Sequence, residues 1–134
     1  ALKELGLSFH ITNTVNVKQT IEGGYHGARL LLERGADITA IVCADDLTAI
    51  GAMQCYREYK IKIPKDISVI GIGDIPHAQR TEPMLTTIHV PVEELGNIAL
   101  KVLLDRIQGG HKLELKVELP YYIAERNSCA RFSR

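Results

Sequence analysis

Residues 39–44 read Thr-Ala-Ile-Val-Cys-Ala, and two aspartates, Asp45 and Asp46, follow them directly. A short continuous apolar run of this kind is typical of a strand that is covered on both faces in a parallel sheet. From Leu47 to about Tyr59, apolar side chains recur at helical spacing. Either aspartate can cap this helix, and one cap is enough. We assign the cap to Asp46, which leaves the Asp45 carboxylate to face a crevice.

Strands and helices alternate on both sides of this stretch. A helix is predicted from about Thr20 to Arg34 and a longer one from Val92 to Gln108. A buried strand is predicted at Ile67–Ile72 and a further strand at Thr86–Val90. Further extended segments are expected at residues 8–17, 113–119 and 121–126. This alternation indicates an α/β fold with right-handed crossovers, a mainly parallel sheet and helices on both faces.

The bulk composition excludes several classes of function. Sixteen basic residues balance sixteen acidic ones among 134, so no net charge attracts the chain to nucleic acid or to a membrane surface. No apolar run reaches the length of a membrane span. Three cysteines, far apart and without a C-x-x-C pair, indicate neither a disulfide framework nor a zinc site. We therefore expect a reduced, cytoplasmic protein that binds no metal ion and no cofactor.

In an open α/β sheet, ligands bind beyond the carboxyl ends of the strands. Here those positions hold Asp45 after one strand and Gly73 with Asp74 after the next. Two carboxylates can also serve as general acid and base, but no nucleophile motif or paired histidine accompanies them. Gly71-Ile72-Gly73 does not open a dinucleotide fingerprint, because Pro76 stands in the place of its third glycine. No catalytic residue is assigned.

Several segments together form the series found in one family of regulators. Residues 44–52, A-D-D-L-T-A-I-G-A, resemble its A-N-D-x-x-A-x-G-A element, and residues 63–71, I-P-K-D-I-S-V-I-G, resemble V-P-x-D-I-S-V-x-G. Residues 82–88, E-P-M-L-T-T-I, resemble P-x-L-T-T-V, and residues 125–128 resemble the closing R-x-S. The helix start at residues 92–96 falls between them. The chain thus resembles the lactose-repressor/galactose-repressor family of transcription regulators.

The resemblance implies a periplasmic-binding-protein-like core of two subdomains with a small-molecule effector, a sugar or a sugar-like compound, in the cleft between them. Residues 1–134 would be the C-terminal part of this effector-binding and dimerisation domain, comprising one subdomain and the crossover segments. The helix-turn-helix domain would be absent, so that operator DNA is bound only through a missing N-terminal domain. The first residues, which read as the end of a helix stopped by Gly6, agree with a fragment.

The resemblance also implies site residues. In sugar-binding members, the asparagine of A-N-D and the first aspartate of G-[FY]-D-D contact ligand hydroxyls, and here those positions are Asp45 and Gly73. Asp74 follows Gly73, and an aromatic residue common in the family would fall at Gln19. The effector-binding residues implied are therefore Asp45, Gly73, Asp74 and Gln19. The helix near Asp46 would lie at the contact of a homodimer, with Met53 and Tyr56 exposed to meet their copies.

Two other classes of function stay open from the sequence. A periplasmic solute-binding protein of an uptake system would share the architecture, although the unpaired cysteines and the repressor-type elements count against it. A small α/β enzyme using Asp45 and Asp74 would need a nucleophile or cofactor fingerprint, and the sequence offers neither.

Overall fold

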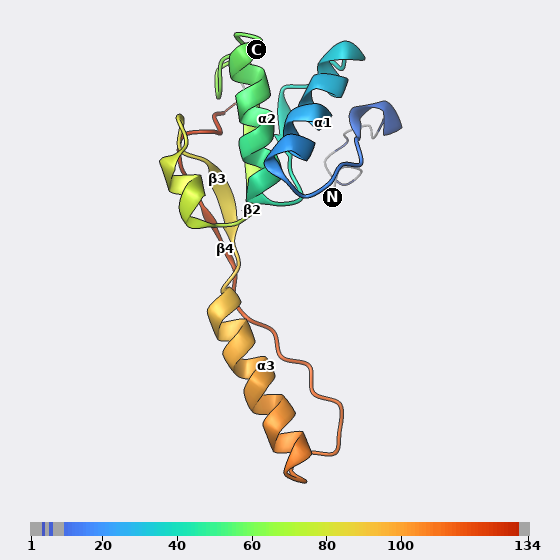
Figure 1. The fold of residues 1–134 in the computed structure, drawn as a ribbon, viewed down its shortest axis with the longest axis vertical. Helices are drawn as coiled ribbons and strands as arrows, with labels where there is room; N and C mark the ends of the chain where they lie inside the picture. The colour runs from blue at the N-terminus through green and yellow to red at the C-terminus, as the bar shows by residue number, and fades with distance from the viewer. Residues whose placement is uncertain (1–3, 5, 7–9, 132–134) are drawn as a thin grey trace.

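The protein has a body of sheet and helices and a long arm that extends from it (Figure 1). The structure is a computed structural model that describes residue 4, residue 6 and residues 10–131 of the chain. The expected helix end at residues 1–7 falls mainly outside the described residues. Of the extended segment predicted at 8–17, the described part contains a short 3-10 helix, Ile11–Asn13, and no strand.

A four-stranded sheet forms the centre of the body, in the order β1 (Ala40–Val42), β2 (Ser68–Gly73), β3 (Thr86–His89) and β4 (Tyr122–Ala124). The first three strands run parallel, and β4 pairs with β3 in the antiparallel direction. The mainly parallel sheet predicted from the sequence is therefore confirmed. Because the parallel strands share a direction, their carboxyl ends lie along one edge.

The outermost strand, β1, is less covered than its apolar sequence indicates. Val42 is 75% exposed, and β1 pairs only with β2 within the described part of the chain. The prediction that this strand is covered on both faces is wrong for the described residues. An apolar strand lies at an open edge of the sheet here.

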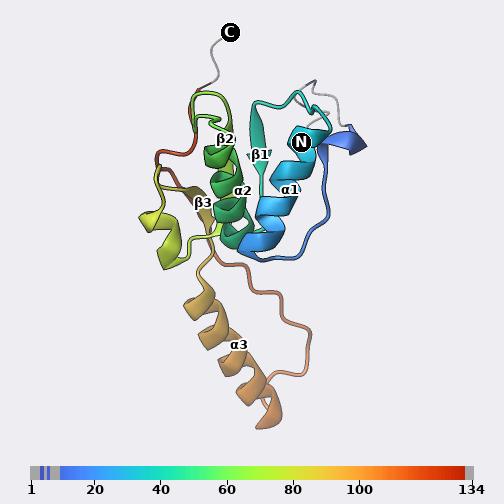
Figure 2. The same ribbon diagram turned by 45° about the horizontal axis from the view of Figure 1, so that its top comes forward.

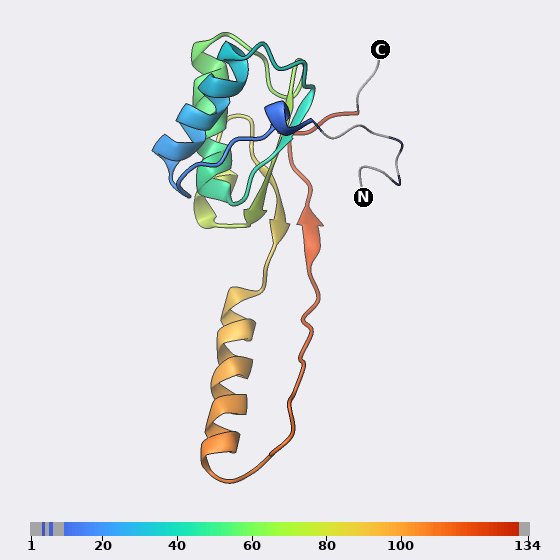
Figure 3. The ribbon, with the colours of Figure 1, turned by 90° about the vertical axis from the view of Figure 1, so that its right-hand side faces the viewer.

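Two helices, α1 (Ile21–Glu33) and α2 (Asp46–Glu58), pack beside each other on one side of the sheet (Figure 3). Their backbones touch at two glycines. A Cβ atom on Gly24 would lie 2.0 Å from the carbonyl oxygen of Thr48, and one on Gly51 would lie 1.9 Å from that of Ile21. This close approach places α2 between α1 and the sheet, and α2 supplies much of the core. The core cluster comprises Ala28, Ala49, Ile50, Ala52, Met53, Cys55, Tyr56, Ile67, Val69, Ala78 and Leu85.

The arm consists of α3 (Val92–Ile107) and the segment that returns from it to β4 (Figures 1 and 3). None of the residues of α3 is buried. The extended segment predicted at residues 113–119 pairs with no other strand in the described part of the chain, so it forms no strand. A second 3-10 helix, Pro76–Arg80, lies between β2 and β3.

Candidate functional site

The carboxyl edge of the parallel sheet brings together the residues that follow three strands. Asp45 stands beyond β1, Gly73 ends β2, and His89 ends β3. Gly73 and His89 are register partners. Asp45, Gly73 and His89 therefore lie at the edge of the sheet where the sequence predicts a ligand site.

Asp45 is the N-cap of α2. Its carboxylate accepts a hydrogen bond from the backbone amide of Thr48 at 2.7 Å, and the Thr48 hydroxyl oxygen accepts one from the Asp45 amide at 3.3 Å. This reciprocal pair is a capping box. The assignment of the cap to Asp46 is wrong, because the extended backbone belongs to Asp45 and the helix begins at Asp46. Half-buried Asp45 therefore has a structural role beside any contact with a ligand.

Asp46 is a buried anchor, with 1% of its surface exposed. The Thr87 hydroxyl donates to its Oδ1 at 2.5 Å, and the Ile75 amide donates to its Oδ2 at 2.8 Å. A Cβ atom on Gly71 would lie 2.3 Å from Asp46 Oδ1, so the carboxylate fills the space above that glycine. Asp46 therefore joins the start of α2 to β3 and to the loop after β2.

Gly73 and Asp74 form the turn at the end of β2, with φ angles of 134° and 60°. Both values lie in the region that favours glycine. A side chain at Gly73 would be strained by this backbone, although the nearest atom to its Cβ, Asp46 Oδ2, would be 3.5 Å away. The absence of the family's carboxylate at Gly73 therefore agrees with the local backbone.

The Asp74 carboxylate is held by the side chains of Arg126 and His89. Arg126 Nη2 donates to its Oδ1 at 2.5 Å, and His89 Nδ1 donates to its Oδ2 at 2.9 Å. Burial alone would raise the pKa of Asp74, but the hydrogen bonds and charges of Arg126 and His89 outweigh it and lower the pKa below its usual value. Both oxygens are thus engaged within the chain, and a ligand would have to share them.

The same contacts tie together the two strands that lead to and from the arm. His89 at the end of β3 stacks on Tyr122 at the start of β4, with ring centroids 4.6 Å apart and planes 19° from parallel. Arg126 also donates to the Leu85 carbonyl oxygen at 2.8 Å. We call Asp74, His89, Tyr122 and Arg126 the crossover cluster. Sequence reasoning missed it, although Arg126 belongs to the closing R-x-S element.

Gln19 lies on a separate surface, a groove of about 1030 Å³. It is lined by residues between 10 and 19, by residues 37–44 around β1, and by residues of α1 and α2. Figure 2 shows where β1, α1 and α2 lie in the body. Gln19 shares this groove with Ala44 and Thr48, whereas Gly73 and Asp74 do not line it. Within the described residues, the structure therefore does not gather all four implied effector residues into one pocket.

Met53 and Tyr56 do not lie on the surface. Met53 is 5% exposed and Tyr56 is fully buried, and both belong to the core cluster. The expectation that they are exposed at a dimer contact is wrong, because α1 and the sheet cover the sides of α2 on which they lie.

The cysteines and the possible metal ligands of the body form no further site among the described residues. The three cysteines are free, and burial, together with the charges of Asp45 and Asp46, raises the pKa of Cys43 to about 12. Its thiol therefore stays protonated near neutral pH. In the described ranges, no group of three or more histidine, cysteine, aspartate or glutamate side chains is arranged to hold a metal ion. None of the described helices is both long and apolar enough to span a membrane.

Known proteins resemble this chain over nearly its whole length. Residues 1–129 match the periplasmic binding protein-like domain family. The regulator MalR of Streptomyces coelicolor is 40% identical over 109 residues, which are 79% of this chain and 31% of that protein. The repressor PurR of Salmonella paratyphi B is 37% identical over 109 residues, 81% of this chain and 32% of that protein.

A solved structure, that of the transcriptional regulator CelR with cellobiose, superposes with a TM-score of 0.91 at 28% identity. The match covers 95% of this chain and 39% of that one. The chain spans about a third of the length of the curated relatives it matches. These relatives are named as transcription regulators and not as enzymes. The chain belongs to the periplasmic binding protein-like domain family, in the form found in LacI-family transcription regulators.

Proposed function

We propose that this chain is the C-terminal part of the effector-binding and dimerisation region of a bacterial transcription repressor that acts in the cytoplasm. Its effector is a small molecule of the sugar or sugar-like class, and the protein binds operator DNA through a helix-turn-helix domain outside these residues. Support comes from relatives named as a regulator and a repressor, and from the cellobiose in the complex of the similar CelR. The function needs no catalytic residue.

The observation that carries the proposal is the double crossing beside the carboxyl edge. The chain leaves the body after β3, forms the arm, and returns through β4. Asp45 and Gly73 stand at the same edge of the sheet as the first of these crossings. A ligand at this edge would therefore lie between the body and the part of the protein that packs on the arm, and it would contact both.

The exposed apolar side chains of the arm indicate that another part of the protein packs on it. Its helix exposes a row of large apolar side chains, and a solitary helix of 16 residues is only marginally stable in water. The row comprises Val92, Leu95, Leu100, Leu103, Leu104 and Ile107. We assign its cover to a second subdomain formed by the rest of the protein. The outer edge of β1, which no described strand pairs with, and the groove beside it would likewise be completed by that second subdomain.

Effector binding between two bodies gives a direct route to regulation. A ligand that contacts both favours the arrangement in which it fits best, and it shifts the population toward that arrangement. The change would be a rotation about the crossing strands, where the crossover cluster lies. The DNA-binding heads of a dimer would then change their spacing.

The test uses the full-length protein and fragments of its own genome. We expect the protein to retain specific fragments, and we expect one class of sugar to change that retention in a saturable way. Unrelated DNA of equal length is the control. A full-length protein that binds a sugar tightly but retains no specific DNA would contradict the proposal and support the solute-binding alternative.

A further inference from the structure

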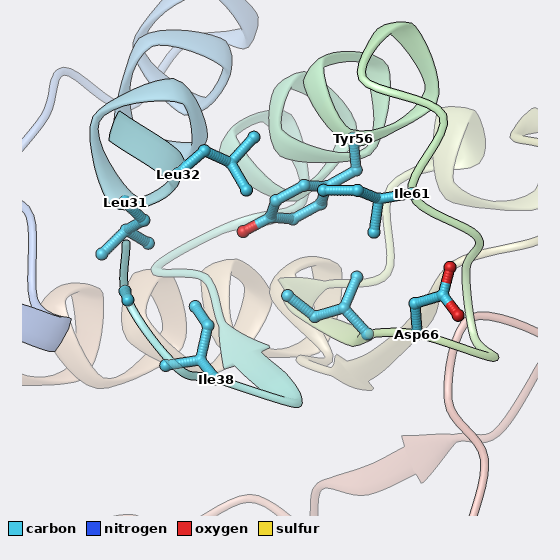
Figure 4. Close-up of a pocket in the computed structure, with 8 residues that line it drawn as sticks. Leu31, Leu32, Ile38, Tyr56, Ile61 and Asp66 are labelled. Atoms are coloured by element: carbon cyan, nitrogen blue, oxygen red, sulfur yellow. The ribbon is translucent and has the colours of Figure 1, made fainter. Parts of the chain in front are cut away.

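A second pocket opens at the opposite edge of the sheet from the candidate effector site. It has a volume of about 360 Å³ and lies among the end of α1 and the turns that lead into β1 and β2 (Figure 4). Its lining is almost entirely aliphatic: Leu31, Leu32, Ala36, Ile38, Ile61 and Ile67. The carboxylate of Asp66 and the ring of Tyr56 complete it.

One polar atom in this pocket lacks a partner. The Tyr56 hydroxyl is buried and makes no hydrogen bond with any residue that the structure describes. Figure 4 shows it pointing into the space among Leu31, Leu32 and Ile38. A buried hydroxyl without a partner carries a desolvation cost of roughly 1–3 kcal/mol, and native proteins seldom leave one unsatisfied.

The hydroxyl is suited to donate. Burial raises the pKa of Tyr56, and the neighbouring Cys43 and Cys55 thiols add to the effect, so the phenol keeps its proton at neutral pH. Aliphatic side chains surround it, and the carboxylate of exposed Asp66 disfavours anions. The missing partner is therefore an uncharged acceptor attached to an apolar body.

We propose that this pocket is a binding site for a small neutral aliphatic molecule with one hydrogen-bond acceptor oxygen, which accepts from the Tyr56 hydroxyl. This pocket is distinct from the carboxyl edge of the sheet, where we propose that the effector binds. Tyr56 lies ten residues after Asp46 on the same helix, and at 1.5 Å per residue the two are about 15 Å apart along its axis. The volume falls within the range of small-molecule sites.

Helix α2 connects the two sites physically. Its N-cap Asp45 and its first residue Asp46 lie at the carboxyl edge of the sheet, and its last turns hold Tyr56 against the pocket. An occupant of the pocket would fix the Tyr56 ring and the ends of α1 and α2. The pocket would then act as a second ligand site on the element that also shapes the first.

The experiment is a titration of the full-length protein, labelled at isoleucine methyl groups, with cyclohexanone. Saturable shifts are expected at Ile38 and Ile61, and none at Ile123 on β4. In Tyr56→Phe, which removes only the hydroxyl, the affinity for cyclohexanone should fall about three- to tenfold, as expected for one neutral hydrogen bond. Methylenecyclohexane has nearly the same shape and no acceptor, and it should bind both proteins equally.

A second variant keeps the test independent of Tyr56. Ala36→Trp should fill the pocket and abolish the shifts at Ile38 and Ile61. Three results would overturn the proposal: no saturable shift in the wild-type protein, equal losses of both ligands in Tyr56→Phe, or a crystal soaked in cyclohexanone that shows only an ordered water on the Tyr56 hydroxyl.

Discussion

The hydroxyl of Thr87 donates to the carboxylate of Asp46 at 2.5 Å, although 41 residues separate the two in the chain. Both side chains are fully buried. The contact fixes the first turn of α2 against β3, and so it sets the position of neighbouring Asp45 at the carboxyl edge of the sheet. Local sequence patterns cannot predict this hydrogen bond, because its two residues are far apart in the chain.

We expect Thr87→Val to destabilise the full-length protein by about 2 kcal/mol, since a hydrogen bond to a charged group is worth roughly 1.5–3 kcal/mol. Urea denaturation followed by circular dichroism measures the change. Thr86→Val is the matched control, because the Thr86 hydroxyl is also buried and accepts from the neutral backbone amide of Arg126 at 3.0 Å. That change should cost about 1 kcal/mol. Equal losses in the two variants would show that the Asp46 contact adds nothing.

Asp74 should make stability depend on pH in acid. Its pKa is lowered in the folded protein, so its contribution is complete above its unfolded pKa of about 4 and is lost as the pH falls through the lower folded value. Asp74→Asn cannot ionise. The difference in unfolding free energy between wild type and Asp74→Asn should therefore be greatest near neutral pH and shrink below about pH 4.

Denaturation curves collected at several pH values test this expectation. Asp37→Asn removes an exposed carboxylate and controls for the loss of one negative charge. A difference for Asp74→Asn that stays constant from neutral pH down to strong acid would contradict the ion pair with Arg126.

Asp45 should contribute to effector affinity as well as to the helix cap, and two substitutions separate these roles. Asp45→Ala removes both the cap and the carboxylate, with a loss of about 1 kcal/mol in stability. Asp45→Ser keeps a capping oxygen and loses the charge. If the carboxylate contacts the effector, calorimetry on full-length protein should show affinity falling roughly ten- to a hundredfold in both variants. Unchanged affinity in Asp45→Ala would remove Asp45 from the site.

This chain alone should show no measurable affinity for duplex DNA, even at low salt. Its sixteen basic and sixteen acidic residues give no net positive charge. Binding to DNA would therefore gain little from the release of counterions that drives non-specific binding. Electrophoretic mobility assays at several salt concentrations measure this, with the full-length protein as the positive control. A tight, salt-dependent shift of operator DNA by residues 1–134 would overturn the assignment of DNA binding to another domain.

The protein is expected to be a dimer at micromolar concentration, and the dimer should not depend on Met53. Because Met53 is buried in the core, the volume-conserving change Met53→Leu should cost less than about 1.5 kcal/mol in stability and leave the dimer dissociation constant unchanged. Sedimentation equilibrium measures the second quantity. A monomeric wild-type protein would refute the dimer, and selective loss of the dimer in Met53→Leu would refute the burial argument.

Local patterns in the sequence predicted most of the helices and strands, and contacts distant in sequence account for the errors. Apolar spacing placed α1, α2 and α3 within about one residue of their observed ends. It could not tell which of Asp45 and Asp46 caps α2, because that depends on Thr87 and Ile75, which lie 41 and 29 residues from Asp46.

The exposure of Met53 and Tyr56 was predicted wrongly for a related reason. Helical spacing shows that apolar residues share one face of α2. It does not show whether other faces of the helix are also covered by neighbouring elements. Gly24 and Gly51 allow the backbones of α1 and α2 to touch, and this buries α2 on more sides than its sequence pattern indicates. The crossover cluster was missed because Asp74 and Arg126 are 52 residues apart.

The length of the arm would amplify any rotation at its root. Its helix has 16 residues, so at 1.5 Å per residue its far end lies about 24 Å from its root beside β3. A rotation of only about 10° at the root would carry that end through about 4 Å, a displacement large enough to remake the packing of an attached domain. A small shift in the His89–Tyr122 stack would thus produce a larger displacement at the far end of α3.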